Sequence, residues 1–471
     1  MKKTLFLIAL VAVFFNHAWA QNNTIAGTWH GAVNVGIQLR IDFHISNEAG
    51  LLKATMDSPD QKAYGIEVDE INLKADTLKL KINRIGFTYS GIYSEDKQII
   101  EGKFSQGGLV KELNLSRNES KEVAEKHFPQ EPLPPFAYHS EAVSFTNSKD
   151  KVNLSGTFSR PQKEGKYPVV VLISGSGPQD RDENISGHKP FLVIADYLTK
   201  QGFAVLRFDD RGFGKSTGSF ANSSLYNFAG DVVAGIDYLK TRTDVDAKKI
   251  ILIGHSEGGY IAPMIASKSK DIALIVLLAG PGVKGVEVLQ TQNRQILEAN
   301  NIGKERIDAE LQTIKESAEV LASSKDSLAK AMELKPIFER HWTKVSEVEK
   351  TAFPSEDAFV RSRIRVWLSP WFSAFVNFDP KPYLEKVKCP VLAMNGTKDI
   401  QVYYKENLEA LKNALDKGGN KRCTFAAMEG LNHLFQTANK GTVDEYSTLE
   451  ETFSPKALQL LGDWLKQEII R

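Results

Sequence analysis

The chain has 471 residues, of which 42% are hydrophobic and 25% are charged. These values are ordinary for a globular protein of two or three domains, and they exclude a disordered chain, a collagen-like repeat and a protein with many membrane spans. Lysine and arginine total 59 against 58 acidic residues, so no basic excess favours nucleic acid, and two cysteines are too few for a disulfide framework or a multi-cysteine metal site.

Residues 1–20 have the pattern of a cleavable export signal. Two lysines precede an apolar run over residues 5–15, and an Ala-Trp-Ala sequence ends at Ala20. The run is shorter than the ~20 apolar residues that a membrane-spanning helix needs. An uncleaved anchor or a buried helix is the alternative interpretation. We therefore expect export to the periplasm or the cell exterior, without stable insertion in a membrane.

Residues 21–117 predict a small antiparallel β-domain, either a barrel or a sandwich. Apolar and polar side chains alternate over residues 37–45 and again over 78–83. This period of two is typical of strands with one buried and one solvated face. The segment holds no cluster of catalytic residue types, so we expect a structural role, with lipid or glycan binding as the alternative.

Residues 118–140 predict a linker between this domain and the next. The segment is first highly charged and then contains four prolines, at positions 129, 132, 134 and 135. Proline removes amide donors and stiffens an extended chain, which disfavours regular structure.

Residues 141–282 and 380–471 predict the two parts of one α/β domain. Short runs rich in valine, leucine and isoleucine alternate with amphipathic stretches of helical length; the runs are residues 168–174, 203–208, 249–254, 272–279 and 391–395. This rhythm is typical of a mostly parallel, doubly wound sheet, whose chemistry gathers where the strands end. Residues 151–158 alternate as an edge strand would.

Residues 283–379 interrupt this rhythm and predict a helical insertion placed as a cap, or lid. Its last part is aromatic and includes Trp367, Trp371 and Phe372. We expect these side chains to line a pocket for an apolar acyl group. Burial in the core of the cap itself is the alternative.

The strongest chemical signal is the sequence Gly-His-Ser-Glu-Gly over residues 254–258. It follows a buried strand and precedes a helix, which is the context of a nucleophile elbow, a tight turn that exposes a serine hydroxyl. We therefore predict that Ser256 is a nucleophile, with a helix N-cap as the alternative. We expect His255 to face away from the position of a base and to serve in packing or in lining the substrate site.

A serine nucleophile needs a base, and the base needs a carboxylate that orients it. Asp399 follows one predicted strand and His433 follows the next, in the chain order serine, acid, histidine that this kind of sheet uses. Each residue taken singly is compatible with an ordinary loop role. Their order and their places after successive strands predict a triad of Ser256, His433 and Asp399.

The oxyanion of the tetrahedral intermediate needs two amide donors. The N–H of Glu257, directly after the serine, is the first candidate. The glycine-rich loop at residues 174–182 offers the second, and we choose the N–H of Ser176 ahead of that of Gly177. A plain glycine-rich turn is the alternative for this loop.

Other motifs have structural explanations. The loop over residues 207–216 lacks the spacing of a phosphate-binding loop, and we expect its charged side chains to hold the loops around the site. Cys389 and Cys423 lie on strands expected to be neighbours, and two buried thiols are favoured over a disulfide. No cluster has metal-ligand spacing, so we expect neither a metal nor a cofactor.

From about residue 140 onward the chain resembles serine hydrolases of the α/β-hydrolase superfamily. The sequences Gly-Ser-Gly-Pro-Gln-Asp-Arg-Asp at residues 175–182 and Gly-His-Ser-Glu-Gly-Gly at 254–259 are more narrowly similar to the EstD-type bacterial carboxylesterases. The resemblance implies a small β-module before the hydrolase domain and a helical insert that caps it.

We therefore expect a secreted hydrolase that cleaves small-molecule carboxylic esters through an acyl-enzyme. A serine peptidase or other amidase on the same fold is the first alternative. A non-catalytic binding protein on a hydrolase scaffold is the second. The sequence leaves the natural substrate and the oligomeric state open, a homo-oligomer included.

Overall fold

A computed structural model of the protein describes residues 25–34, 38–59, 63–106, 109–118, 127–162, 164–350, 353 and 355–470. The predicted export signal at residues 1–20 lies outside the described residues. The chain separates into two compact units, Met1–Lys126 with Val345–Phe359, and His127–Lys344 with Val360–Arg471. This division passes through the predicted insertion at residues 283–379.

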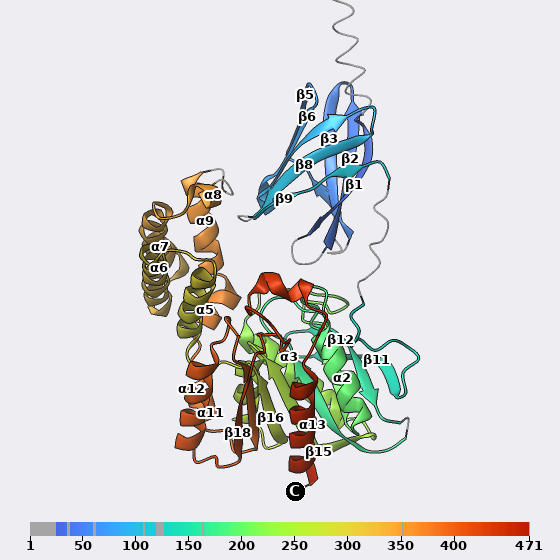
Figure 1. Cartoon of the computed structure of the whole chain (residues 1–471), viewed down its shortest axis with the longest axis vertical. Helices are drawn as coiled ribbons and strands as arrows, with labels where there is room; N and C mark the ends of the chain where they lie inside the picture. The colour runs from blue at the N-terminus through green and yellow to red at the C-terminus, as the bar shows by residue number, and fades with distance from the viewer. Residues whose placement is uncertain are drawn as a thin grey trace, which may run out of the picture. The chain divides into compact units, whose positions relative to one another are not determined.

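The first unit contains an antiparallel sheet with the strand order β4-β3-β2-β1-β10-β8-β7-β6-β5, and β9 pairs with β8 (Figure 1). The strands are β1 (Gly27–Asn34), β2 (Gln38–Glu48), β3 (Leu51–Ser58), β4 (Ala63–Glu67), β5 (Glu70–Lys74), β6 (Thr77–Ile82), β7 (Phe87–Ser94), β8 (Ile99–Gln106), β9 (Leu109–Glu112) and β10 (Leu115–Ser116). The predicted N-terminal antiparallel β-domain is confirmed.

The edges of this sheet meet at the short link between β4 and β5. The N–H of Val68 donates to the carbonyl of Ala54 on β3 (3.0 Å), and the N–H of Asp69 donates to the carbonyl of Lys81 on β6 (2.9 Å). The sheet therefore closes on itself around an apolar interior, because alternate side chains of each strand point inward. Trp29 is fully buried there, and the guanidinium of Arg117 lies 3.9 Å from its ring.

The second unit contains a sheet with the strand order β11-β12-β14-β13-β15-β16-β17-β18. The strands are β11 (His139–Asn147), β12 (Val152–Arg160), β13 (Tyr167–Ile173), β14 (Ala204–Phe208), β15 (Val245–His255), β16 (Ile272–Leu278), β17 (Val391–Gly396) and β18 (Cys423–Met428). β11 and β12 run antiparallel to their neighbours, and the strands from β14 to β18 pair in parallel. The predicted mostly parallel sheet is confirmed.

The prediction of an edge strand at residues 151–158 was wrong. β12 covers this segment, but β11 pairs along its outer side and takes the edge. β11 begins at His139, inside the predicted linker at residues 118–140. The preceding residues also contact this unit, since the Gln130 side chain donates to the carbonyl of Phe453 (2.7 Å) and accepts from the N–H of Thr452 (2.6 Å).

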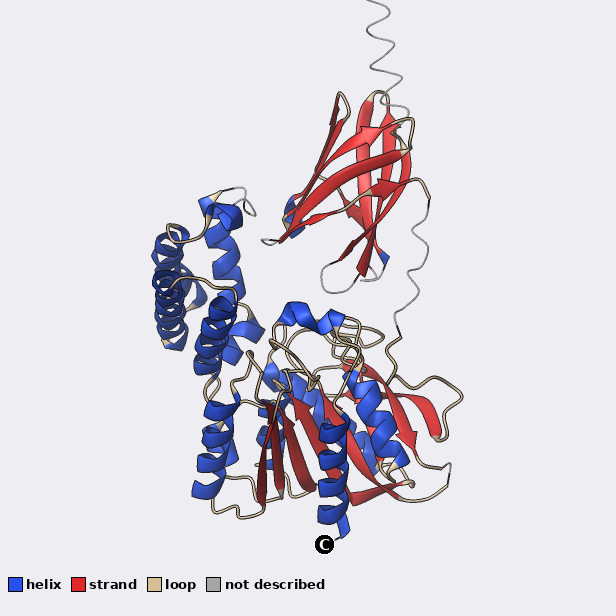
Figure 2. Cartoon of the chain, viewed as in Figure 1, coloured by secondary structure: helices blue, strands red, loops and turns tan. Residues whose placement is uncertain are grey.

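Helices cover both faces of the parallel sheet (Figure 2). One face packs against α3 (Leu225–Lys240), α4 (Gly258–Ala266) and α12 (Tyr404–Lys417), and the other against α2 (Pro190–Lys200) and α13 (Pro455–Ile470). In β13, for example, Val169 and Val171 face the first cluster, while Val170 and Leu172 face the second. Burial on both faces explains why the central strands are continuous apolar runs.

The segment between β16 and β17 is helical, as the sequence predicted. Its helices are α5 (Gly285–Ala299), α6 (Lys304–Ala322), α7 (Ser327–Trp342), α8 (Glu347–Lys350), α9 (Glu356–Trp367), α10 (Pro370–Asn377) and α11 (Lys381–Leu384). A search of the described helices for one long and apolar enough to cross the bilayer found none.

The two cysteines are separate thiols in this structure. Cys423 lies on β18 opposite Val391, and Cys389 lies just before β17. Burial raises the pKa of the Cys389 thiol to about 12 and that of the Cys423 thiol to about 11. Both side chains therefore stay protonated near neutral pH and pack as small apolar groups.

The core of the parallel sheet gives a first prediction. Leu252 is fully buried at the centre of β15, whereas Leu51 is 71% exposed at the start of β3. We expect Leu252→Ala to lower the free energy of unfolding by about 2–5 kcal/mol, because it leaves a cavity in the core. The matched change Leu51→Ala is expected to alter it by no more than about 0.5 kcal/mol. Urea unfolding of both variants followed by circular dichroism checks this, and equal effects would contradict the described core.

Candidate active site

The turn between β15 and α4 carries Ser256 in a strained backbone conformation. Ser256 has a φ of 51°, in the left-handed region, and its N–H donates to the carbonyl of Leu278 on β16 (2.9 Å). A methyl group on Gly254 would lie 2.1 Å from the carbonyl oxygen of Gly258, and one on Gly258 would lie 2.3 Å from that of Ile173. Both glycines are therefore required, as the tight turn of a nucleophile elbow demands.

The glycine-rich loop after β13 lies against this turn. A methyl group on Gly175 would lie 3.2 Å from the Cβ of Ser256, so the loop backbone passes directly beside the serine. In the described part of the chain, the N–H groups of Ser176 and Glu257 donate to no other backbone group. Both predicted oxyanion donors are thus available, and their assignment stays a prediction, as does that of Gly177.

The predicted acid and base meet in a buried hydrogen bond. The Nδ1–H of His433 donates to Oδ2 of Asp399 (2.8 Å), and Oδ1 of Asp399 accepts from the N–H groups of Gln401 (2.8 Å) and Val402 (2.9 Å). Asp399 is 2% exposed and His433 is 4% exposed. Donation from Nδ1 fixes the tautomer of His433 and leaves a lone pair on Nε2, the arrangement that a general base needs.

The two loops that carry Asp399 and His433 pack against each other. The N–H of Lys398 donates to the carbonyl of Leu431 (2.9 Å), and a methyl group on Gly396 would lie 2.1 Å from that same oxygen. Neighbouring parallel strands β17 and β18 deliver the loops to one edge of the sheet. The contact between the loops then holds the acid against the base.

His255 is buried and packs against His433, as the packing alternative expects, and it also forms hydrogen bonds that the sequence did not predict. Its Nε2 donates to the main-chain carbonyl of His433 (3.0 Å), and its Nδ1 lies 2.9 Å from Oε1 of Glu183. The N–H of Gly175 donates to the same carboxylate oxygen (2.6 Å). These contacts join the glycine-rich loop, the serine turn and the loop of the base through one buried pair.

At pH values below the raised pKa of His255, its ring is an imidazolium facing Glu183. Both ring nitrogens of His255 face acceptors, so the ring carries two protons. Burial, the largest influence, lowers the pKa of His255, but the charge and hydrogen bond of Glu183 and the carbonyl of His433 outweigh it and raise that pKa. Glu183 was not predicted from the sequence. A positive φ of 52° at a glutamate next to the glycine-rich loop is its structural signature, and no sequence pattern reveals it.

Charged side chains brace the loops beside the site, in agreement with the predicted role of residues 207–216. Asp209 forms an ion pair with Arg181 (2.7 Å), and Asp210 accepts from the hydroxyl of Ser174 (2.8 Å). Burial raises the pKa of Asp210 to about 8, with backbone and hydroxyl donors opposing the rise. Asp210 is therefore largely protonated at neutral pH.

The aromatic residues of the insertion divide between two environments. The indole N–H of Trp371 on α10 donates to Oε2 of Glu257 (2.8 Å), so this side chain reaches the serine turn. Trp367 is 6% exposed and packs against Phe338 and Phe372, with ring centroids 6.2 Å and 5.2 Å away. Substrate binding by Trp367, Trp371 and Phe372 stays a prediction, and Trp371 has the contact nearest the site.

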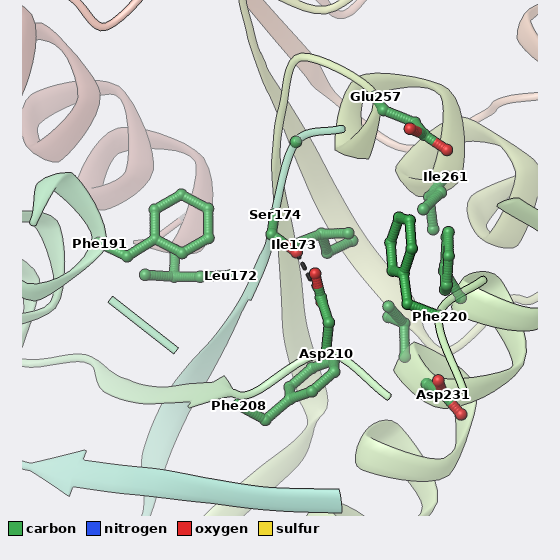
Figure 3. A pocket seen from close by; sticks show the side chains of 13 residues that line it. Leu172, Ile173, Ser174, Phe191, Phe208, Asp210, Phe220, Asp231, Glu257 and Ile261 are labelled. Carbon is green, nitrogen blue, oxygen red and sulfur yellow. Dashed lines mark hydrogen bonds between the residues drawn. The ribbon is translucent and has the colours of Figure 1, made fainter. Parts of the chain in front are cut away.

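A pocket opens beside the serine turn, between the ends of β13 and β14 and the helices α3 and α4 (Figure 3). Its walls are mostly apolar and aromatic, with three acidic side chains among them. The lining residues are Leu172, Ile173, Ser174, Gly175, Phe191, Phe208, Asp210, Phe220, Phe228, Asp231, Val232, Glu257 and Ile261.

The structure therefore brings together most of the predicted site. Asp399 and His433 are hydrogen-bonded, and Ser256 follows His255, whose ring centroid lies 4.8 Å from that of His433. Among the hydrogen bonds of the described residues, none joins Ser256 to His433. The role of Ser256 as nucleophile stays a prediction. A search of the described residues for a group of three or more metal-ligating side chains found none.

The buried pair of Glu183 and His255 gives a second prediction. Its contribution to stability is present at acid pH and is lost as the pH rises through the raised pKa of His255. We expect Glu183→Gln to lower the free energy of unfolding by about 1–3 kcal/mol at about pH 5.5, and by less at about pH 8.5.

Glu298→Gln, an exposed site on α5, is the matched control and should change neither value. Urea unfolding at both pH values measures the difference. A loss that is equal at the two pH values would contradict an ionised pair.

Comparisons with known proteins find similarity to hydrolases. A family model described as serine aminopeptidase, S33, matches residues 189–340. Esterase EstD of Thermotoga maritima is 26% identical over 305 residues, which are 64% of this chain and 63% of EstD. Palmitoyl-protein thioesterase ABHD10 of Bos taurus is 30% identical over 139 residues, 28% of this chain and 40% of that protein. The chain thus spans less than two thirds of the length of either relative.

Among solved structures, the Pyrococcus furiosus esterase Pf2001 has a TM-score of 0.43 and 18% sequence identity, covering 70% of this chain and 91% of that one. The strand order and the tight turn at Ser256 are those expected from the sequence resemblance, and the family match at residues 189–340 falls on the same unit. The chain therefore has an α/β-hydrolase fold and is similar to esterase EstD.

Proposed function

We propose that the protein is a serine hydrolase that cleaves carboxylic esters of small molecules. The observation that carries the proposal is the buried hydrogen bond between Asp399 and His433, which sets the tautomer of the imidazole beside the turn of Ser256. An oriented base of this kind is what a serine hydroxyl needs to act as a nucleophile. The similarity to esterase EstD supports the choice of ester over other acyl substrates.

The reaction proceeds in two halves. Ser256 Oγ attacks the acyl carbon while its proton passes to Nε2 of His433, and the N–H groups of Glu257 and Ser176 hold the oxyanion. The intermediate then expels the alcohol, which takes the proton from His433. Water next attacks the acyl-enzyme, giving a proton to His433, and the carboxylic acid leaves as Ser256 recovers its hydrogen. Asp399 stays ionised and stabilises the imidazolium.

The proposal extends to the surroundings of the site. The helical insertion acts as a cap over the acyl pocket, supported by the hydrogen bond from Trp371 on α10 to Glu257.

Residues 1–20 direct export to the periplasm or the cell exterior, supported by their composition. Sequencing the N-terminus of the exported protein tests this, and a mature chain starting at Gln21 is the expected result.

Replacing the nucleophile is the direct test of the mechanism. We expect Ser256→Ala to lower turnover of p-nitrophenyl esters by a factor of at least about 10⁴, because the acyl-enzyme cannot form. The fold should be unchanged, as measured by circular dichroism and thermal unfolding. Undiminished turnover would refute the role of Ser256, and a failure of the wild type to react with a fluorophosphonate probe would favour a non-catalytic binding protein.

An amidase or peptidase is the second candidate, favoured by the match to the family described as serine aminopeptidase, S33. The same residues would act on an amide, whose nitrogen must be protonated by His433 before it leaves. We expect acyl esters to be hydrolysed with a higher kcat/KM than aminoacyl amides of the same acyl chain. The opposite order would make the peptidase the better description.

A further inference from the structure

The pocket beside the serine turn contains the carboxyl group of Glu257, which has no role in the proposed mechanism. Figure 3 shows the Glu257 side chain on the pocket wall above Ile261 and Phe220, with Asp210 on the facing wall. Glu257 is 2% exposed, although the side chain follows directly after the predicted nucleophile. The mechanism uses only its backbone N–H, so the buried carboxyl needs a separate explanation.

The other two acids of the pocket have partners for both carboxyl oxygens. Asp210 accepts from the hydroxyl of Ser174 (2.8 Å) and the N–H of Gln179 (2.9 Å). Both oxygens of Asp231 accept from the guanidinium of Arg211, each at 2.7 Å. These carboxyl groups are parts of the scaffold, because their hydrogen-bonding capacity is already used.

Glu257 differs from them by one vacant acceptor. Its Oε2 accepts from the indole N–H of Trp371 (2.8 Å), whereas its Oε1 is buried without a hydrogen-bond partner among the described residues. A buried polar oxygen in this position carries a desolvation penalty until a donor reaches it. Trp371 also fixes the orientation of the carboxyl group, so the vacant oxygen is held in a defined position.

The chemistry of the walls favours a donor brought by a ligand. The described residues that line the pocket include no lysine, arginine or histidine. Burial raises the pKa of Glu257, while the indole of Trp371 and the hydroxyl of Ser176 oppose the rise. A ligand that donates a hydrogen bond to Oε1 would restore part of the lost solvation of the carboxylate.

We propose that Glu257 is a specificity residue that accepts a hydrogen bond from an amine or hydroxyl group on the acyl part of the substrate. The inference rests on the proposed function, because the site lies one residue from Ser256. A group held by Oε1 is then close to the scissile carbonyl, which points to a donor on the carbon next to it. The substrate class is 2-amino or 2-hydroxy acyl esters.

Three methyl esters of one size test this inference: butanoate, 2-hydroxybutanoate and 2-aminobutanoate. We expect wild-type kcat/KM to be about ten times higher for at least one donor-bearing ester than for butanoate, which is the effect of one additional hydrogen bond. The donor-bearing ester that is preferred identifies the amine or the hydroxyl. Wild-type preference for butanoate over both would overturn the proposal.

The variant Glu257→Gln removes the acceptor with little change of shape. Because the N–H of Trp371 requires an acceptor, the amide oxygen takes the Oε2 position and the amide NH₂ takes the vacant one. The preference for the donor-bearing ester should then fall about tenfold. Trp371→Phe, which frees the carboxyl group to turn, should lower the same ratio. An equal loss for all three esters would overturn the proposal.

Asp210→Asn is the matched control in the same pocket. Both oxygens of Asp210 have partners and its pKa is raised to about 8, so the neutral amide should leave the ratio among the three esters unchanged at neutral pH. Circular dichroism and thermal unfolding of each variant separate a change of specificity from a loss of fold.

A binding measurement keeps this inference separate from the proposed catalysis. Ser256→Ala cannot form the acyl-enzyme, so the intact esters serve as ligands. Methyl 2-aminobutanoate or methyl 2-hydroxybutanoate should raise the unfolding temperature of Ser256→Ala more than methyl butanoate does, and this difference should vanish in the double variant with Glu257→Gln. If all three esters raise the unfolding temperature of Ser256→Ala equally, the proposed binding of the donor group by Glu257 is refuted. If wild-type protein hydrolyses none of the esters but the difference in unfolding temperature between the esters persists, the proposed function fails. The proposed binding of the donor group by Glu257 is then retained.

Discussion

The tight turn at Ser256 is the constraint on which the rest of the site depends. The backbone at residues 254 and 258 passes so close to its neighbours that only glycine fits, and Ser256 itself has a φ of 51°. Strain of this kind persists only where the surrounding structure holds it in place. Strand β15 on one side and helix α4 on the other supply that support, since residues 250–255 of β15 and all of α4 are buried.

The side chains on either side of Ser256, those of His255 and Glu257, contact different partners. His255 contacts Glu183 and the carbonyl of His433, while Glu257 accepts from Trp371. One turn therefore connects the loop of the base, the glycine-rich loop and the helical insertion. A shift of Ser256 would disturb all of these contacts together, so a few buried polar groups hold the turn in a position that no single loop could hold.

Most buried carboxyl groups around the site have complete sets of partners. Glu183 contacts His255, Asp209 forms an ion pair with Arg181, and Asp399 accepts hydrogen bonds from His433 and two backbone N–H groups. Removing water from a charged group is costly, so such pairs persist where their hydrogen bonds are also complete. Glu257 is the exception, because its Oε1 forms no hydrogen bond with a described residue, although the hydroxyl of Ser176 lies near enough to lower the pKa of this carboxyl group. A buried polar oxygen without a partner is unusual in a folded protein, and this one lies one residue from Ser256.

The sequence by itself determined the local features: the alternation of the β-domain, the apolar runs of the parallel sheet, the turn at Ser256, and the order of Asp399 and His433 after successive strands. These follow from patterns within a few residues of one another, or from the rule that parallel strands end at one edge. Only the tertiary structure decided that β11 takes the sheet edge, that His255 connects Glu183 to the loop of His433, and that Trp371 reaches Glu257. Glu257 and Trp371 are 114 residues apart, and a contact across such a distance depends on how strands and helices pack, which no local pattern records.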